Sequence, residues 1–343
     1  MRTDWNIDLS GRNTFRMKVS CRCFVEYGSA DELRDVLGDP SYPRPLFPIG
    51  GGSNLLFTGD FPGTILHCTA KGIRRLGPDR VYADAGVLWD DFCAWCAKEG
   101  LWGPENLSYI PGEVGAAAVQ NIGAYGREVG EIIESVECVD SKDCSFVSIP
   151  ASECAYGYRE SRFKNEWKGR YIVTGVTFRL SEEPSPVLDY GHVREALEQR
   201  YGADALANLT SGMIRKTITA IRREKLPDVE VMGSAGSFFR NPVVSRERYE
   251  AVVEVAEKES LGPVPHYEAG ESKVKIPAAW LIDRCGLKGK RLGGAGVYEK
   301  QPLVIVNRSG DASPQDVMAL DCEVRAAVLS KFAIPLEKEV EFV

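Results

Sequence analysis

Two runs of the chain are almost free of bulky side chains, and each is suited to holding an anion or a flat ring. The first, Gly50-Gly51-Gly52-Ser53-Asn54, follows an apolar segment that is predicted to be a strand. Consecutive glycines let main-chain N–H groups converge on an anion, and the serine and asparagine add side-chain donors. A pyrophosphate is the natural ligand. An ordinary turn is the alternative, because the spacing matches neither GxGxxG nor the GxxxxGK[ST] phosphate loop.

The second run extends from Ile110 to Gly126 and is rich in glycine and alanine. Larger side chains would hold a ligand away from the backbone, so this composition favours close approach of a flat ring or of further pyrophosphate oxygens. A tightly packed helix and loop inside one domain is the alternative interpretation.

Arg159 and Ser237 have side chains that could take part in chemistry. The planar fork of Arg159 suits a carboxylate, although a surface pairing with Glu160 or Asp140 would also explain it. Ser237 follows Gly236 and precedes two phenylalanines, and no His–Asp pattern accompanies it, so it is not interpreted as an acyl-transfer nucleophile. A hydrogen bond from Ser237 to nearby backbone is the structural alternative.

Three acidic residues alternate near the end of the chain, namely Glu337, Glu339 and Glu341. Alternation of this kind is typical of one face of a strand. Composition alone favours a solvated acidic tail, so the residues by themselves do not single out a catalytic carboxylate.

Local patterns predict a mixture of helices and strands that positions these residues. Ser29 and Ser313 are predicted to cap helices, the first through a Ser-x-x-Glu capping box with Glu32. The segment 233–241 is predicted to be a turn of small residues. Strands are expected at 20–27, 45–49, 64–68, 81–85, 132–140, 171–180 and 303–307, helices at 89–99, 192–206, 217–225, 277–285 and from 313 to about 330, and an extended end at 336–343.

Charge and composition exclude several classes of protein. The 343 residues include 42 Lys and Arg against 49 Asp and Glu, a net charge of -7. The chain therefore lacks the excess of positive charge that is expected of a protein that binds nucleic acid. No apolar run is long enough to span a bilayer and the first residues form no signal peptide, so we expect a cytoplasmic protein that does not bind membranes. The ten cysteines are expected to be reduced, and Cys93-x-x-Cys96 lacks the partners of a metal site.

Five segments together resemble the UDP-N-acetylenolpyruvoylglucosamine reductases, in the longer type of that family that has a tyrosine in a substrate loop. They occur in the order of that family and extend from Gly50 almost to the last residue. The resemblance implies an FAD enzyme that uses NADPH to reduce the enolpyruvyl ether of UDP-N-acetylglucosamine to UDP-N-acetylmuramate. The segments are 50–57, 110–126, 156–161, 236–242 and 336–340.

The resemblance also implies a fold and a domain organisation. The fold is α+β, with a two-lobed FAD-binding domain of the PCMH/vanillyl-alcohol-oxidase type and a third, substrate-binding α+β domain. We expect the first flavin lobe at 1–70, with 331–343 packing back on it, and the second lobe at 71–210. The substrate-binding domain is expected at 211–318, and a helix and strand at 319–343 return to the flavin lobes.

Specific residues acquire roles through the same resemblance. Gly50–Asn54 would receive the pyrophosphate of non-covalent FAD, and Gly115–Gly126 would lie along the ribityl chain and the isoalloxazine edge. The cofactor residues implied are Gly50, Gly51, Gly52, Ser53, Asn54, Pro111, Gly112, Gly115, Ala116, Ala117, Gln120, Asn121, Gly123, Ala124 and Tyr125. The substrate residues implied are Tyr190, Lys225, Asn241 and Lys275, and no metal is expected.

The family's catalytic positions correspond to Arg159, Ser237 and Glu339. Arg159 would bind and polarise the substrate carboxylate, and Ser237 would protonate C2 after hydride addition at C3. Glu339 would either polarise the substrate or assist proton delivery. We expect a monomer. A sugar or alcohol oxidase of the same fold and a non-catalytic nucleotide-sugar binding protein are the alternatives, and the absence of histidine from both glycine runs disfavours a covalently tethered flavin.

Overall fold

The computed structural model describes Met1 to Val343, and the chain divides into two compact units. Unit 1 consists of Met1–Ile7, Cys21–Gly51 and Phe61–Glu224, and unit 2 of Asp8–Ser20, Gly52–Asp60 and Lys225–Val343. Each unit combines helices with sheets, as the predicted α+β class requires. The finer division into four parts remains a prediction.

Eight α-helices and twenty short strands form the two units. The helices are α1 (Ala30–Gly38), α2 (Trp89–Lys98), α3 (Val114–Gln120), α4 (Val193–Tyr201), α5 (Ser211–Lys225), α6 (Arg246–Lys258), α7 (Ala278–Arg284) and α8 (Pro314–Phe332). The strands are β1 (Arg2–Asp8), β2 (Ser20–Tyr27), β3 (Leu46–Ile49), β4 (Leu55–Leu56), β5 (Phe61–Cys68), β6 (Ile73–Arg75), β7 (Arg80–Asp84), β8 (Gly123–Ala124), β9 (Arg127–Glu128), β10 (Ile133–Asp140), β11 (Phe146–Pro150), β12 (Tyr171–Arg179), β13 (Gly233–Ser237), β14 (Val243–Ser245), β15 (Tyr267–Glu268), β16 (Lys273–Lys275), β17 (Arg291–Leu292), β18 (Ala295–Val297), β19 (Val304–Asn307) and β20 (Glu341–Phe342).

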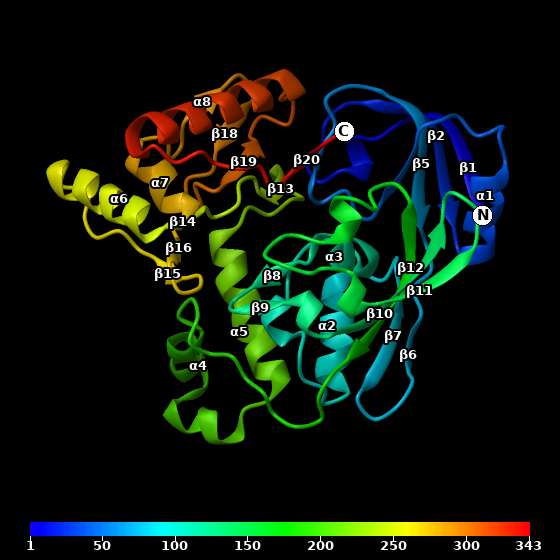
Figure 1. The fold of residues 1–343 in the computed structure, drawn as a ribbon, viewed down its shortest axis with the longest axis horizontal. Helices are drawn as coiled ribbons and strands as arrows, with labels where there is room; N and C mark the ends of the chain where they lie inside the picture. The colour runs from blue at the N-terminus through cyan, green and yellow to red at the C-terminus, as the bar shows by residue number, and fades with distance from the viewer. The chain divides into compact units, whose positions relative to one another are not determined.

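Unit 1 is built on two sheets. The first has the order β1-β2-β5-β3, and its strands β2, β5 and β3 are parallel. The second has the order β11-β10-β12-β7-β6 and is antiparallel, with α3 packed against β12 and β7 and with α2 beside α3 (Figure 1). Trp89, Phe92 and Phe178 are fully buried in the core that joins these elements. Burial of such large rings is the main stabilising contribution here.

The parallel strands of unit 1 fix where the first glycine run lies. β3 ends at Ile49, whose register partner on β5 is His67, and Gly50 follows directly. The run therefore starts at the carboxyl edge of the parallel strands. In open sheets with parallel strands, that edge is where ligands bind.

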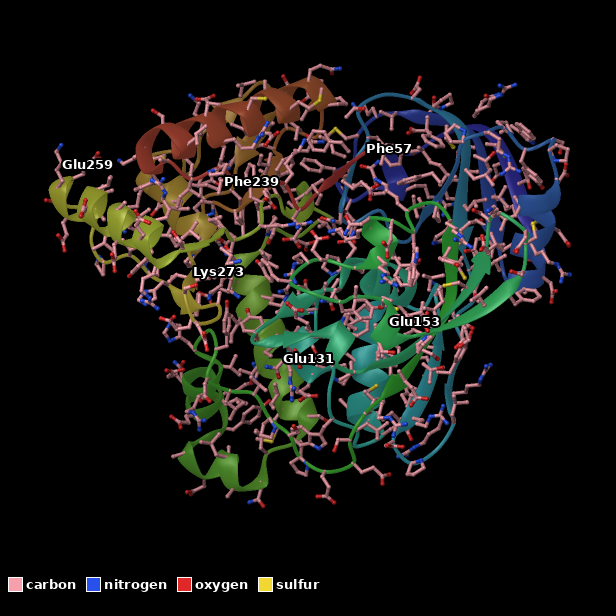
Figure 2. All side chains as sticks on the ribbon, in the orientation of Figure 1. Phe57, Glu131, Glu153, Phe239, Glu259 and Lys273 are labelled. Atoms are coloured by element: carbon pink, nitrogen blue, oxygen red, sulfur yellow. The ribbon has the colours of Figure 1, made fainter.

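Unit 2 is organised around the sheet β13-β19-β18-β17. Helix α8 packs on β17 and β18, and α6 and α7 lie next to α8 (Figure 1). A smaller sheet, β14-β16-β15, and the parallel pair β4 and β20 complete the unit. Phe239 is buried among these elements, whereas Glu259 lies at the far end of α6 (Figure 2).

Most local predictions agree with the structure within a few residues. The strand expected at 20–27 is β2, and Ser313 caps α8 through a capping box with Asp316. The box predicted at α1 is only half correct. Ser29 accepts a hydrogen bond from the Glu32 N–H at 3.2 Å, but the Glu32 carboxylate accepts from Gly28 N at 2.7 Å.

Two local predictions need correction. The turn expected at 233–241 is wrong for its first half, because residues 233–237 form β13 and pair with β19. Small residues suit this strand since a Cβ at Gly233 would lie 2.5 Å from the Phe15 carbonyl oxygen. The helix expected at 192–206 ends at Tyr201, and Gly202, with φ of 88°, separates it from a 3₁₀ segment. Helix α6 was not predicted, although Ser245 caps it.

The cysteines carry no disulfide, and all ten thiols are free. Burial raises the pKa of Cys93 and Cys96 well above the ordinary thiol value, so both side chains are protonated near neutral pH. No helix of the protein combines the length and the apolar character needed to cross a bilayer.

Candidate active site

The start of the first glycine run is in contact with the second run inside unit 1. A Cβ at Gly50 would lie 3.2 Å from the Cβ of Ala116 and 3.3 Å from Oε2 of Glu113. A Cβ at Gly51 would lie 3.7 Å from the Cα of Gly112. Two segments that are more than fifty residues apart thus meet at Gly50 and Gly51, where the lack of side chains on the glycines permits the close approach.

The second run contains α3 and the turn that follows it. Gly115 is required by packing, because a Cβ there would lie 2.8 Å from the Cβ of Ala85, and its N–H donates to the Ala85 carbonyl at 2.9 Å. The predicted cofactor residues lie before α3 (Pro111, Gly112), within it (Gly115, Ala116, Ala117, Gln120), and in the turn and β8 or just after it (Asn121, Gly123, Ala124, Tyr125).

Asn121 is fully buried and uses its side chain inside unit 1. It ends α3 in the left-handed conformation, with φ of 45°. Its Nδ2 donates to Glu128 and to the Gly157 carbonyl, each at 2.7 Å, and its Oδ1 accepts from Gly130 N at 2.9 Å. These bonds hold the turn in shape, so Asn121 positions the residues that follow it.

Arg159 is brought to the second run by a tight turn. Gly157 and Glu160 exchange two main-chain hydrogen bonds, and Arg159 has φ of 57°, which is uncommon for a residue other than glycine. Its Nη2 donates to the Gly123 carbonyl at 2.6 Å. The alternative partner Asp140 instead pairs with Arg170 at 2.9 Å. Strained residues of this kind cluster at functional sites.

Arg222 is a further charged residue close to Arg159, and its role was not predicted from the sequence. It lies on α5, and its Nε donates to the Tyr109 carbonyl at 3.1 Å. Burial lowers the pKa of Arg222 and the like charge of Arg159 adds to this effect, whereas Tyr125 opposes it. The sequence did carry a signal for Arg222. This residue follows the buried residues Ile214 and Ile218 at intervals of four, so it lies on the same face of α5.

Tyr190 lies beside the end of the second run. A Cβ at Gly126 would lie 3.5 Å from the Cβ of Tyr190, and a Cβ at Gly191 would lie 3.0 Å from the Tyr125 ring. Asn106 joins the same segments, since its Nδ2 donates to the carbonyls of Tyr125 at 2.7 Å and Val187 at 2.8 Å. The predicted substrate tyrosine therefore adjoins the predicted flavin residues of unit 1.

The rest of the first run belongs to unit 2. A Cβ at Gly52, where φ is 62°, would lie 2.3 Å from the carbonyl oxygen of Arg12, so only glycine fits. Ser53 follows in the same turn. Asn54 donates from Nδ2 to the main-chain oxygen of Glu339 at 3.0 Å, and its own carbonyl accepts from Glu341 N at 3.0 Å. This contact joins residues 285 positions apart.

Ser237 and Glu339 are neighbours in unit 2. Glu339 N donates to the carbonyl of Phe238, the residue after Ser237, at 2.9 Å. Both residues are half-buried, whereas the side chain of Glu337 is 77% exposed. This difference favours Glu339 over Glu337 as the functional carboxylate. Fully buried Phe238 packs on Phe342 with ring centroids 6.1 Å apart, which fixes the two segments together.

The remaining predicted substrate residues are also in unit 2. Asn241 precedes β14, and its Oδ1 accepts from Ala278 N at the start of α7 at 2.9 Å. Lys275 pairs with Val243 across β14 and β16, so it lies near Asn241 at the same end of this sheet. Lys225 is the last residue of α5 and the first of the third segment of unit 2.

The residues present fit an FAD molecule. Gly50 and Gly51 adjoin Gly112 and the methyl group of Ala116, with the Glu113 side chain beside Gly50, and the glycines themselves leave the main chain bare, as a pyrophosphate or a flat ring needs. The half-buried Arg159 guanidinium lies at the other end of the second run.

Comparison with known proteins identifies the family. The chain is 48% identical over 339 residues to UDP-N-acetylenolpyruvoylglucosamine reductase of Bacteroides fragilis, covering 98% of each chain. The chain belongs to this reductase family. The corresponding enzyme of Neisseria gonorrhoeae is 41% identical over 98% of this chain and 96% of its own. An FAD binding domain model matches residues 21–148, and the model of the C-terminal domain of UDP-N-acetylenolpyruvoylglucosamine reductase matches residues 227–343.

A solved structure of this reductase family has the same fold. The enzyme of Thermus caldophilus superposes with a TM-score of 0.70 at 23% identity and covers 100% of this chain and 99% of its own. The predicted family, α+β flavoprotein fold and FAD cofactor are therefore confirmed.

Proposed function

We propose that the chain reduces UDP-N-acetyl-3-O-(1-carboxyvinyl)-glucosamine with NADPH and so makes UDP-N-acetylmuramate, a precursor of the bacterial cell wall. The observation that carries this function is the 48% identity to the Bacteroides fragilis reductase along nearly the whole of both chains. The local arrangement agrees with it, because Ser237 and Glu339 lie on hydrogen-bonded neighbouring segments.

The cofactor is held by main chain in this proposal. Gly50–Asn54 would hold the pyrophosphate of FAD, and Gly115–Gly126 would hold its ribityl and isoalloxazine part. Bound FAD would supply the hydride-transfer chemistry between NADPH and the enolpyruvyl group. The protein supplies placement and an electrostatic field.

Arg159 binds the carboxylate of the enolpyruvyl group. Addition of hydride at C3 leaves negative charge at C2, and this charge spreads onto the adjacent carboxylate. A guanidinium fork stabilises that charge more strongly as it develops. The second guanidinium, that of Arg222, increases the positive potential around Arg159.

Ser237 donates the proton that completes the reaction at C2. A serine hydroxyl is a weak acid in water, so the donation depends on a strongly basic carbanion held within hydrogen-bond reach and on nearby charge. Glu339 has two candidate roles, either to polarise the substrate or to assist delivery of the proton. The variant Glu339→Gln separates them, since it keeps a polar group but removes the basic carboxylate.

The nucleotide part of the substrate is assigned to four residues. Lys225 and Lys275 provide positive charge for the diphosphate, Asn241 provides an amide, and Tyr190 covers the uridine diphosphate. The position of Asn241 and Lys275 at one end of the β14-β16 sheet supports their acting together.

A cytoplasmic, monomeric enzyme is part of the proposal. NADPH and nucleotide sugars are metabolites of the cytoplasm, which supports the location. The exposed large apolar side chains lie on separate elements, for example Trp5 on β1 and Phe146 on β11, which supports the monomer. Light scattering of the purified protein after size-exclusion chromatography measures the oligomeric state.

An anaerobic titration tests the function. The purified protein should show a flavin absorption spectrum that bleaches with NADPH and recovers when the enolpyruvyl substrate is added. Recovery with oxygen but not with the substrate would support an oxidase of the same fold. Binding of UDP-sugar without any bleaching would support a non-catalytic binding protein.

One contact in the structure favours the oxidase alternative. His67 is distant from the glycine runs in the sequence, yet its Nε2 lies 3.1 Å from Glu113, which adjoins Gly50. Acid precipitation decides whether the flavin is covalently attached, because yellow colour that stays with the protein would contradict non-covalent FAD.

A further inference from the structure

Four charged or titratable side chains form a cluster beside Gly50 that the proposed mechanism does not use. Glu113 is 5% exposed, and its Oε1 accepts from His67 Nε2 at 3.1 Å and from Lys71 Nζ at 3.3 Å. On the other side of the imidazole, Nδ1 of His67 lies 3.7 Å from Glu26 Oε1 and makes no hydrogen bond. The cluster is within unit 1.

Glu113 links this cluster to the glycine turn. It stands at the N-cap of α3, but its carboxylate makes no capping bond and reaches towards β5 instead. Its second oxygen, Oε2, is the atom 3.3 Å from a Cβ placed at Gly50. A buried negative charge therefore lies beside the turn that is assigned to an anionic pyrophosphate.

A buried carboxylate next to an anion is unfavourable unless positive charge accompanies it. Glu26 and Glu113 are both acidic, and each has a basic side chain near it, since Lys71 lies 3.3 Å from Glu113 and Arg2 lies 4.0 Å from Glu26. Burial raises the pKa of Tyr27 and Cys68, which stay neutral.

We propose that His67 and Lys71 are positioning residues that hold and compensate the Glu113 carboxylate beneath Gly50, so that FAD binding tightens when the charge of Glu113 is removed and weakens when the charge of Lys71 is removed. The ligand named here rests on the proposed function. The sign follows from Coulomb's law, because positive charge on the cluster favours the pyrophosphate and negative charge disfavours it.

The experiment measures FAD affinity of the full-length flavoprotein by dilution, with the recovery of flavin fluorescence reporting release. Lys71→Met removes the positive charge beside Glu113 and should raise the Kd on the order of threefold to tenfold. His67→Gln keeps an N–H donor to Glu113, so it should hold the carboxylate in place and change the Kd less than Lys71→Met does. His266→Gln, a histidine of unit 2, is the matched control and should behave like the unaltered protein.

Glu113→Gln provides the sharpest test. Removing the negative charge should tighten FAD binding at pH 8.5 on the order of threefold to tenfold, whereas loss of a merely structural contact would weaken it. This variant also covers the case in which His67→Gln fails to fold.

Two results would overturn the proposal while the reductase function stands. One is Lys71→Met binding FAD as tightly as the unaltered protein, and the other is Glu113→Gln binding FAD more weakly at pH 8.5. A protein that binds no flavin at any pH would instead refute the proposed function together with this inference.

Discussion

Substitution of Gly52 by alanine should destabilise the protein far more than a glycine-to-alanine change usually does. The new Cβ would lie 2.3 Å from the carbonyl oxygen of Arg12 and 2.8 Å from the Cα of Asn13. Both neighbours are main chain, so rotation of a side chain cannot relieve the clash. The turn must move, and the hydrogen bond from Thr14 N to the Gly52 carbonyl, at 3.1 Å, must stretch or break.

The expected cost has two parts. Gly52 has φ of 62°, and a side chain at such a position costs about 1 kcal/mol. Moving packed backbone to make room for a methyl group adds about 2 kcal/mol. Gly310 provides a matched control in the same unit, because its φ is 79° but no atom lies within 4 Å of its Cβ position. Gly310→Ala should therefore cost only about 1 kcal/mol.

Urea unfolding followed by tryptophan fluorescence measures the free energy of unfolding of both variants, and flavin fluorescence measures FAD release in the same samples. Gly52→Ala should lose about 3 kcal/mol of unfolding free energy and should bind FAD more weakly, because its turn is displaced. Equal destabilisation of the two variants would show that the close approach to Arg12 does not exist. A stable Gly52→Ala protein with normal FAD affinity would remove the first glycine run from the cofactor site.

Three further variants or reactions test the chemistry of the chain. Ser237→Ala should leave reduction of FAD by NADPH nearly intact and slow oxidation by the substrate by about 10²–10⁴-fold, as stopped-flow absorbance will show; equal slowing of both steps would argue against proton donation by Ser237. Arg159→Lys loses the bidentate fork and should reduce kcat/KM for the enolpyruvyl substrate by about 100-fold, while KM for NADPH changes little. Iodoacetamide at pH 8 should label exposed Cys322 and spare Cys93 and Cys96, because burial raises the pKa of both; mass spectrometry that found them alkylated in the folded protein would contradict their burial.

Local signals predicted individual elements well where the signal was strong. β2 has the predicted bounds, and α8 begins at its predicted cap, Ser313. The segment 233–237 was mistaken for a turn because its small residues favour turns locally, whereas pairing with β19 makes it a strand. Helix α6 was missed although Ser245 caps it, the Ser245 hydroxyl accepting from Arg248 N at 3.2 Å.

The site was predicted in part. The contact of Gly50 with Ala116 agrees with the inference that both bare runs serve one ligand. The roles of His67 and Glu113 were not found, because each depends on a partner from a distant segment. Nothing near Glu113 in the sequence indicates that His67, 46 residues earlier, is its partner.

Residue type and short spacing were enough to identify the bare stretches of backbone, the strongest helices and strands, and the reductase family that the chain resembles. Which distant residues meet depends on the folded chain. The amide of Asn54 bonds the main chain of Glu339 across 285 residues, and Glu113 acquires its hydrogen-bond partners from β5 and the residues after it. Hydrogen bonds and ion pairs act over a few ångströms, so the partner of such a group is fixed by how the chain folds and not by its neighbours in the sequence.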